Sequence, residues 1–472
     1  MLTDNDIIFN VRDATNVGKT ERTKTHLRSN LPDHLKNNIK DDLKDGTANA
    51  ENFSLADFIQ STEATLMGRV VPFSRYYQQN LATGKALYCR EIMGPCEHRS
   101  QIRNQRTGKI REMVMLGSNN YLGLTTHPKI REAAINSIQN FGSGMGGPPL
   151  LNGMSSLHRK LERRLVELKC GSHVQHSDYD AMIFASGYQA NLGWVTGLMR
   201  KGDVLLCDEL SHASVYDGIA MAGTNVQAFR FRHNNTEHLE KLLKRSSQKG
   251  GRQIFVTVEG VYSMDGDIAP LDKIAALCSQ YQATLVIDDA HGVGVLGKNG
   301  GGIAEYYSLQ GNVDISVGTF SKTFGATGGF IVAKKEVIDY LRFFSRSYMF
   351  SAHLPPSTVA SVLACLDVLE QEPQLIKKLH ENANYLRAGL HSQGFNIQNE
   401  TAILPILIPE KFDVREINKR LDDEGIFLNS IEYPAVPRHL QRLRASVMAT
   451  HTREDLDLTI SAFGKVKREL KL

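Results

Sequence analysis

The chain has 472 residues, of which 41% are hydrophobic and 22% are charged, so it can bury a large core and form two or three folding units. Its formal net charge of +4 is small, and its basic residues are scattered among acids, which excludes a nucleic-acid-binding footprint. Six cysteines are dispersed without a Cys-x-x-Cys pair or a Cys/His cluster. We therefore expect reduced thiols, a cytoplasmic location and no metal site.

The first part of the chain divides into a polar segment and a helical one. Residues 1–52 are rich in Asn, Asp, Lys and Thr, which predicts a mobile or weakly helical extension. Residues 53–117 form an N-terminal helical and strand segment: the apolar spacing at about 53–82 predicts one or two helices, and 113–117 predicts a strand entering a polar turn. The start of the chain lacks the order of a secretory signal, and no apolar run reaches transmembrane length. Peripheral contact with a membrane stays open.

Short apolar strands alternate with helical segments over residues 118–354, which predicts a large α/β domain with a mostly parallel sheet. Buried strands are expected at 181–184, 203–206, 253–258 and 284–287. Past residue 355 the pattern changes to longer helices with a few strands, so residues 355–472 are expected to form a smaller C-terminal α+β domain.

The most informative residue is Lys322, on a polar turn between Gly318 and Gly325. Small neighbours let a flat ring approach the backbone, and a lysine amine can bind an aldehyde covalently. Asp288 ends the strand at 284–287, where a buried carboxylate is costly unless a cation meets it. A protonated pyridine nitrogen would supply that cation. The two residues together predict pyridoxal 5′-phosphate (PLP) as the cofactor.

Two further strand ends carry polar groups toward the same edge of the sheet. The stretch 185–191 opens a helix whose free N–H groups and dipole favour a phosphate dianion. His212 follows the strand at 203–206 and is placed to stack on a ring. Taken alone, His212 more often caps the next helix or bonds locally.

Five stretches of the chain together resemble one enzyme family, over roughly residues 73 to 470. They are Ser118–Leu124, Ser211–Ser214, Glu259–Leu271, Asp288–Gly292 and Gly318–Lys322. In this order they resemble the α-oxoamine synthases, which are PLP-dependent enzymes of the aspartate-aminotransferase fold, also called fold type I. The resemblance implies a large domain with a mostly parallel sheet and a smaller C-terminal domain.

The resemblance also implies roles around the cofactor ring. Lys322 corresponds to the residue that binds PLP covalently, and Asp288 to the partner of the pyridine nitrogen. His212 corresponds to the residue that stacks on the ring, while His291 and Ser263 correspond to residues near the phenolic oxygen. Lys322, His212, Asp288 and His291 form the expected catalytic set.

The remaining implied roles concern the phosphate, the substrate and a second subunit. Gly187, Tyr188 and Thr319 correspond to phosphate-binding residues, and Asn119 and Arg444 to binders of the amino-acid carboxylate. A further position, Ser351, corresponds to one that reaches the phosphate in the neighbouring subunit. The resemblance therefore implies a homodimer with shared active sites.

The reaction implied is a decarboxylating condensation of an amino acid with an acyl thioester, giving an α-amino ketone. Stretches such as 212–218 and 231–234 are most similar to serine palmitoyltransferases, which implies serine, a long-chain acyl-CoA and a place in sphingolipid biosynthesis. The alternatives are another amino acid or a shorter acyl donor, as in glycine C-acetyltransferases or 8-amino-7-oxononanoate synthases. A carrier protein as acyl donor, another fold-type-I reaction and an idle binding subunit also remain open.

Two positions depart from the family pattern. Glu432 stands where bacterial serine palmitoyltransferases tend to carry an arginine that engages the substrate carboxylate. Pro148 and Pro149 replace a polar or basic pair near the acyl entrance. Two prolines fix backbone angles and remove donors, so we expect either a stiff apolar rim suited to a long acyl chain or a rigid turn.

Overall fold

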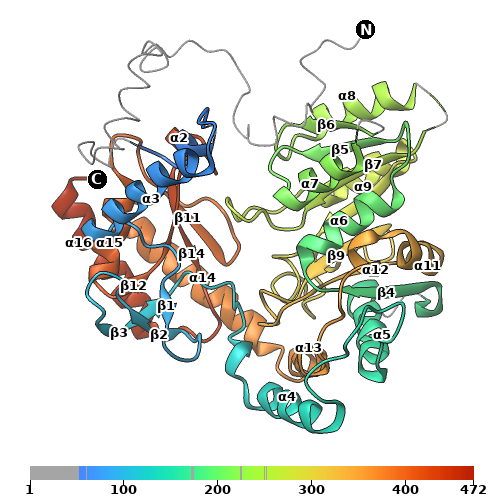
Figure 1. The fold of residues 1–472 in the computed structure, drawn as a ribbon, viewed down its shortest axis with the longest axis horizontal. Helices are drawn as coiled ribbons and strands as arrows, with labels where there is room; N and C mark the ends of the chain where they lie inside the picture. Colours follow the sequence, from blue (N-terminus) through green and yellow to red (C-terminus); the bar gives the residue numbers. More distant parts are fainter. Residues whose placement is uncertain (1–52, 60, 172–174, 224–225, 249, 251) are drawn as a thin grey trace.

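The computed structural model describes residues 53–472, except 60, 172–174, 224–225, 249 and 251. The expected N-terminal extension, residues 1–52, lies outside the described residues. Figure 1 shows two lobes: one is built on a large central sheet, and the other, the small lobe, joins the blue N-terminal elements to the orange and red C-terminal ones.

The large lobe contains a seven-stranded sheet in the order β4-β10-β9-β8-β7-β5-β6. The bounds are β4 (Tyr179–Phe184), β10 (Gly329–Lys334), β9 (Ile315–Thr319), β8 (Thr284–Asp288), β7 (Ile254–Glu259), β5 (Val204–Asp208) and β6 (Gln227–Phe231). Strand β10 pairs antiparallel with both β4 and β9, whereas the pairs from β9 to β6 are parallel. The predicted mostly parallel sheet and fold class are therefore confirmed.

Helices cover both faces of this sheet, so its central strands are buried on both sides and read as continuous apolar runs. One face packs against α6 (Gly187–Leu198), α7 (Ala213–Ala222), α11 (Lys335–Phe344) and α12 (Arg346–Met349). The other packs against α5 (Ser156–Cys170), α8 (Thr236–Ser247), α9 (Leu271–Gln280) and α13 (Pro356–Gln371), with α10 (Ile303–Tyr306) nearby. Helix α4 (Pro128–Phe141) lies on α13.

The small lobe combines two short sheets with five helices among the described residues. One sheet has β1 (Glu91–Ile92), β2 (Arg99–Arg103), β3 (Ile110–Met115) and β12 (Ile426–Phe427); the other has β11 (Ile403–Leu407), β14 (Arg442–Ser446) and β13 (Asn429–Ile431). The helices are α2 (Ala56–Ile59), α3 (Leu66–Thr83), α14 (Gln374–Ser392), α15 (Val414–Asp423) and α16 (Arg453–Leu470). Strand β12 pairs parallel with β3, so the C-terminal region completes the N-terminal sheet.

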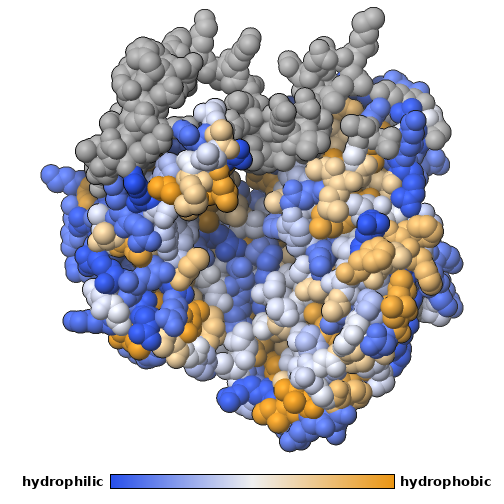
Figure 2. All heavy atoms as spheres, in the orientation of Figure 1, coloured by the Kyte–Doolittle hydropathy of each residue, from blue (hydrophilic) through white to orange (hydrophobic). Residues whose placement is uncertain are grey.

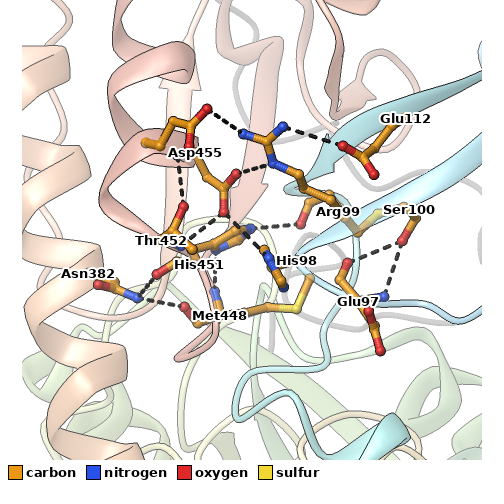
Figure 3. Close-up of polar contacts among 12 residues, drawn as sticks. Glu97, His98, Arg99, Ser100, Glu112, Asn382, Met448, His451, Thr452 and Asp455 are labelled. Atoms are coloured by element: carbon orange, nitrogen blue, oxygen red, sulfur yellow. Dashed lines mark hydrogen bonds and ion pairs between the residues drawn. The ribbon is translucent and has the colours of Figure 1, made fainter.

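A polar cluster fastens the N-terminal sheet to α16 (Figure 3). Asp455 accepts a hydrogen bond from Arg99 Nε at 2.5 Å and another from the Thr452 N–H at 2.9 Å, which forms the helix cap. The ring of His451 lies between Met448, whose N–H donates to Nδ1 at 2.9 Å, and the carbonyl of Met115, 3.2 Å from Nε2. Burial lowers the pKa of His451 to about 4, so it links the two segments as a neutral ring.

Candidate active site

The candidate site lies at the carboxyl ends of the parallel strands, where ligands bind in open α/β sheets. Three neighbouring strands, β5, β7 and β8, end in the buried carboxylates Asp208, Glu259 and Asp288. The register pairs Glu259 directly with Asp288. Figure 2 shows a hollow between the two lobes on this face, with hydrophilic and intermediate residues on its walls.

Asp288 is held by an amide rather than by a protein cation. Asn191, on α6, donates from Nδ2 to Asp288 Oδ2 at 2.7 Å and to Ser214 Oγ at 2.9 Å. Its Oδ1 accepts from the indole of Trp194 at 3.1 Å, so the amide orientation is determined by its partners. The neighbouring Asp289 differs, because Lys169 Nζ lies 2.6 Å from its Oδ2 and forms a buried structural ion pair.

Lys322 lies in the turn after β9, within the electrostatic field of both strand-end acids. Burial lowers the pKa of Lys322 to about 8, and Arg444 acts in the same direction, while Asp288 and Glu259 offset part of the effect. The Lys322 side chain makes no hydrogen bond to the described residues. The amine therefore interacts electrostatically with Asp288 and is partly neutral near physiological pH, as a nucleophile or base requires.

Glu259 is a site residue to which the sequence analysis gave no role. Its Oε2 accepts from the Ser263 N–H at 3.2 Å, whereas its buried Oε1 has no hydrogen-bond partner among the described residues. Burial and the neighbouring Asp288 raise the pKa of Glu259 well above its usual range. Glu259 could have been selected from the sequence, because it is a carboxylate at the end of an apolar strand, which is the feature that selected Asp288.

The expected phosphate-binding residues come together at the start of α6. A Cβ at Gly187 would lie 2.9 Å from the Thr319 Cβ, so a larger residue would displace the neighbouring strand end. The Thr319 hydroxyl donates to the carbonyl of Gly328 at 3.0 Å. The helix begins at this point, next to the Thr319 side chain: Ser186 Oγ caps the Gln189 N–H at 3.1 Å, and the N–H groups of the two preceding residues have no partner within the helix.

Tyr188, the third expected phosphate residue, has an exposed ring. Its hydroxyl donates to Asp217, and this hydrogen bond raises the pKa of Tyr188 to about 12. The hydroxyl is therefore engaged with α7 in this arrangement. The backbone of Tyr188 still lies in the first turn of α6.

Two histidines flank the acids and both are held by defined partners. His291 is buried, and the hydroxyl of Tyr121 lies 2.7 Å from its Nδ1. Burial, together with nearby Lys322 and Arg444, lowers the pKa of His291 well below its usual range, so the ring is neutral. Tyr121 was not singled out from the sequence, although it lies in the stretch 118–124.

His212 occupies the cap position of α7, as the simpler sequence interpretation held. Its Nδ1 accepts from the Ser214 N–H at 3.2 Å and lies 2.7 Å from the Ser214 hydroxyl. Its ring meets that of Tyr188 edge to face, with centroids 6.3 Å apart. Desolvation lowers the pKa of His212, and Asp288 and Lys322 act on it from opposite directions, so the ring borders the site.

The expected carboxylate binders, Asn119 and Arg444, are in direct contact. Arg444, on β14, donates from Nη1 to Asn119 Oδ1 at 3.1 Å and to Ser446 Oγ at 3.1 Å. Its Nε donates to the carbonyl of Ser263 at 2.5 Å. The Tyr121 hydroxyl also lies beside this guanidinium, which offsets part of the effect of burial on the pKa of Tyr121. The structure thus brings together Asn119, Tyr121, Ser263 and Arg444.

Ser351 and Glu432, two further positions singled out from the sequence, lie in different places. Ser351 Oγ is 3.5 Å from Gln189 Nε2, beside the first turn of α6. Glu432 lies elsewhere in the small lobe: its Oε1 accepts from Tyr88 at 2.9 Å, and Oε2 is 3.8 Å from Arg415 Nε. Glu432 is therefore engaged with the N-terminal segment and α15.

The residues present fit PLP. Asp288 has an amide partner and no ion pair with a described cation, Glu259 has an orphaned oxygen beside it, and Lys322 supplies an amine. A helix start next to a threonine hydroxyl offers the donors that a phosphate needs. Among the described residues, no group of three or more His, Cys, Asp or Glu side chains could hold a metal ion.

Comparisons with known proteins agree with this geometry. A profile of the aminotransferase class I and II family matches residues 111–463. The 8-amino-7-oxononanoate synthase of Thermoanaerobacter pseudethanolicus is 40% identical over 363 residues, 77% of this chain and 89% of that protein. The serine palmitoyltransferase (SPT) of Bacteriovorax stolpii is 37% identical over 364 residues, 77% of this chain and 84% of that protein.

A solved structure of SPT with PLP superposes with a TM-score of 0.79 at 32% identity, covering 86% of this chain and 99% of the other. Fold and site together define a PLP-dependent transferase of fold type I. More narrowly, the chain belongs to the α-oxoamine synthases, the PLP-dependent acyltransferases of that class.

Proposed function

We propose that this chain catalyses the decarboxylating condensation of serine with a long-chain acyl thioester, giving an α-amino ketone, carbon dioxide and a free thiol. The observation that carries the reaction is the convergence of Lys322 and Asp288 with the Asn119–Arg444 pair from the other lobe. This arrangement supplies an amine of lowered pKa, an anion for a pyridinium and a guanidinium nitrogen for a carboxylate.

We assign the cofactor-binding roles as follows. Lys322 would bind PLP covalently, Asp288 would pair with its ring nitrogen, and His212 would lie against the ring. His291 and Ser263 would lie beside the phenolic oxygen. Gly187, Tyr188 and Thr319 would hold the phosphate, together with Ser351 of a second subunit. When bound, PLP supplies an electron sink for the charge that develops at the substrate Cα.

The protein groups then perform binding, orientation and proton transfer. Asn191 keeps Asp288 in the orientation that favours a protonated ring nitrogen. Arg444 holds the amino-acid carboxylate and thereby determines which bond at Cα is aligned for cleavage. The Lys322 amine, once released, lies where it can remove and return the Cα proton.

The acyl chain length is inferred from the rim near the two prolines. The carbonyl of Pro148 accepts from the N–H groups of Leu151 at 3.1 Å and Gly153 at 2.9 Å, so the segment is a tight turn. Leu151 is 81% exposed, and Phe350, next to Ser351, is 71% exposed. The N–H of His353 bonds to Gly147, which ties these two segments together. Exposed apolar side chains there support a long apolar acyl group.

A homodimer would cover another exposed apolar surface. Figure 2 shows hydrophobic residues gathered over α11 and α12, where Tyr340, Phe343 and Phe344 are exposed. The proposed reach of Ser351 into a second active site is consistent with this surface being an interface.

No helix in the described part of the chain has the length and apolar character needed to cross a bilayer. The cytoplasmic location stays a prediction; the structure leaves all six cysteines unpaired.

Product analysis tests the reaction and separates it from the alternatives. The purified holoenzyme is incubated with a panel of amino acids and with acyl-CoA or acyl-carrier thioesters of graded length. We expect mass spectrometry to show an amino ketone and carbon dioxide release to match thioester consumption, with serine and long chains preferred. Preference for another amino acid or a short chain would favour the glycine C-acetyltransferase or 8-amino-7-oxononanoate synthase type. Turnover without thioester consumption would contradict the proposed class.

The lowered pKa of Lys322 predicts a pH dependence for cofactor uptake. Only the neutral amine attacks an aldehyde, so covalent loading of the apoenzyme should slow as pH falls below about 8, the pKa of Lys322, and level off above it. Stopped-flow absorbance of the bound cofactor at a series of pH values measures this. A midpoint near the ordinary value for lysine, about 10.4, would show that the amine is not desolvated.

A further inference from the structure

We propose that His233, which lies outside the site, is a positioning residue that holds Arg444 in place through the loop of residues 260–268. The inference rests on the proposed role of Arg444 in binding the amino-acid carboxylate. His233 follows β6 at one side of the loop, and Arg444 lies on the small lobe at the other side.

His233 joins two carboxylates from different segments. Its Nδ1 lies 3.0 Å from Asp208 Oδ1, at the end of β5, and its Nε2 lies 2.8 Å from Asp267 Oδ2, in the loop. The next residue, Asn234, has a φ of 51° and donates to both acids, from its N–H to Asp208 and from Nδ2 to Asp267. The ring edge also meets Tyr262, with centroids 4.4 Å apart. One side chain therefore ties the base of the loop to the large sheet.

The groups around the His233 ring determine its charge. Burial opposes protonation, but the hydrogen bonds to Asp208 and Asp267 raise the pKa of His233 to about 10. Glu209 places a further carboxylate next to this residue, since its Oε1 accepts from the backbone N–H of His233 at 2.8 Å. A raised pKa means that the stabilisation is fully present below the ordinary histidine pKa of about 6.5 and is lost as pH rises through about 10. At neutral pH His233 is therefore a protonated imidazolium between the carboxylates of Asp208 and Asp267.

The loop itself is a tight turn that fits closely against the small lobe. The Tyr262 N–H bonds to Asp267 O at 3.0 Å, and the Gly266 N–H bonds to Tyr262 O at 2.7 Å. Gly266 has a φ of +68°, and a Cβ there would lie 2.5 Å from the Ile403 carbonyl, so only glycine allows this approach. Thr401 Oγ1 donates to the Gly266 carbonyl at 2.5 Å.

Two arginines of β14 take their positions from the same loop. Arg444 Nε donates to the Ser263 carbonyl at 2.5 Å, and its Nη1 donates to Asn119 Oδ1 at 3.1 Å. Arg442 Nη1 donates to Asp265 at 2.5 Å and to the Met264 carbonyl at 3.1 Å. Movement of residues 263–265 would therefore shift the guanidinium that receives the substrate. From the large lobe, His233 and Asn234 hold Asp267, and Glu259 accepts from the Ser263 N–H, so His233 is one of three supports of that loop.

The test uses His233→Gln, which removes the charge, with Asp267→Asn as the partner change and His391→Gln as a matched control. His391 lies on α14, where its Nε2 is 2.8 Å from the Ile397 carbonyl. We expect His233→Gln to raise the KM and the Kd for the amino acid by about tenfold or more, with a much smaller change in kcat. The Kd is measured from the absorbance of the bound cofactor. The reason is that a small displacement of the Arg444 guanidinium weakens its binding of the substrate carboxylate. Asp267→Asn should act alike, and the double variant should add little.

A second measurement is independent of cofactor and turnover. Hydrogen exchange of the apoenzyme, followed by mass spectrometry, should show faster exchange in the peptide covering 260–269 in His233→Gln but not in His391→Gln. Unchanged exchange there, or a Kd equal to wild type while wild type binds the amino acid, would overturn the proposal. A lower Tm with unchanged Kd would show a purely structural role and would also overturn it. If wild type bound no amino acid, the proposed function would fail, and the exchange result would still decide the position of the loop.

Discussion

Replacing Lys322 with alanine is expected to reduce turnover by about 10³-fold or more, because it removes both the covalent anchor and the proposed general base. PLP should still bind, since Asp288, the α6 start and Thr319 remain. Steady-state assay of product, with cofactor content measured after desalting, gives the two readouts separately.

The control for this change is Lys377→Ala, a lysine on α14 whose side chain is 80% exposed. It should leave turnover unchanged. Borohydride reduction followed by peptide mass analysis should place the cofactor on Lys322 in wild type and on no lysine in the variant. Near-normal turnover by Lys322→Ala would contradict its assignment as the base.

Arg444→Ala is expected to weaken amino-acid binding by about 10- to 100-fold, since a hydrogen bond to a charged group contributes about 1.5–3 kcal/mol. Cofactor retention should be unaffected, because the guanidinium contacts Ser263, Asn119 and Ser446 rather than the strand-end acids. Absorbance titration of the holoenzyme with amino acid measures the Kd.

Two companion variants sharpen this result. Arg444→Lys keeps the charge but loses the planar fork, so its Kd should fall between those of wild type and alanine. Arg453→Ala removes an exposed arginine at the start of α16 and should change nothing. If Arg444→Ala bound amino acids as wild type does, another cation would have to hold the carboxylate.

The strands at the centre of the sheet were predictable in part. The four expected strands correspond to β4, β5, β7 and β8, whose apolar runs are buried on both faces. Strands β6, β9 and β10 were not anticipated. Strand β9 reads Ile-Ser-Val-Gly-Thr, and a polar and glycine-containing run of five residues becomes a strand only because β8 and β10 pair with it.

The site residues, too, could be predicted only where the residues next to them in the sequence were distinctive. Lys322 and Asp288 could be selected because each stands in a distinctive local setting. Glu259 was not selected, although it is as buried as Asp288, which it faces on the neighbouring strand. His212 met the simpler expectation of a helix cap, and its stacking role stays a prediction.

The amino-acid sequence by itself determined the α/β class and the residues at the strand ends, because strand periodicity, helix starts and short glycine-flanked turns are local properties of the chain. It also carried the resemblance to the α-oxoamine synthases, through five short stretches in a fixed order. Tertiary structure alone decided which distant groups meet: Arg444 with Asn119, 325 residues away, and His233 with two acids from separate segments. Such pairings depend on how two lobes pack through one loop, and that packing is not written in any single stretch of residues.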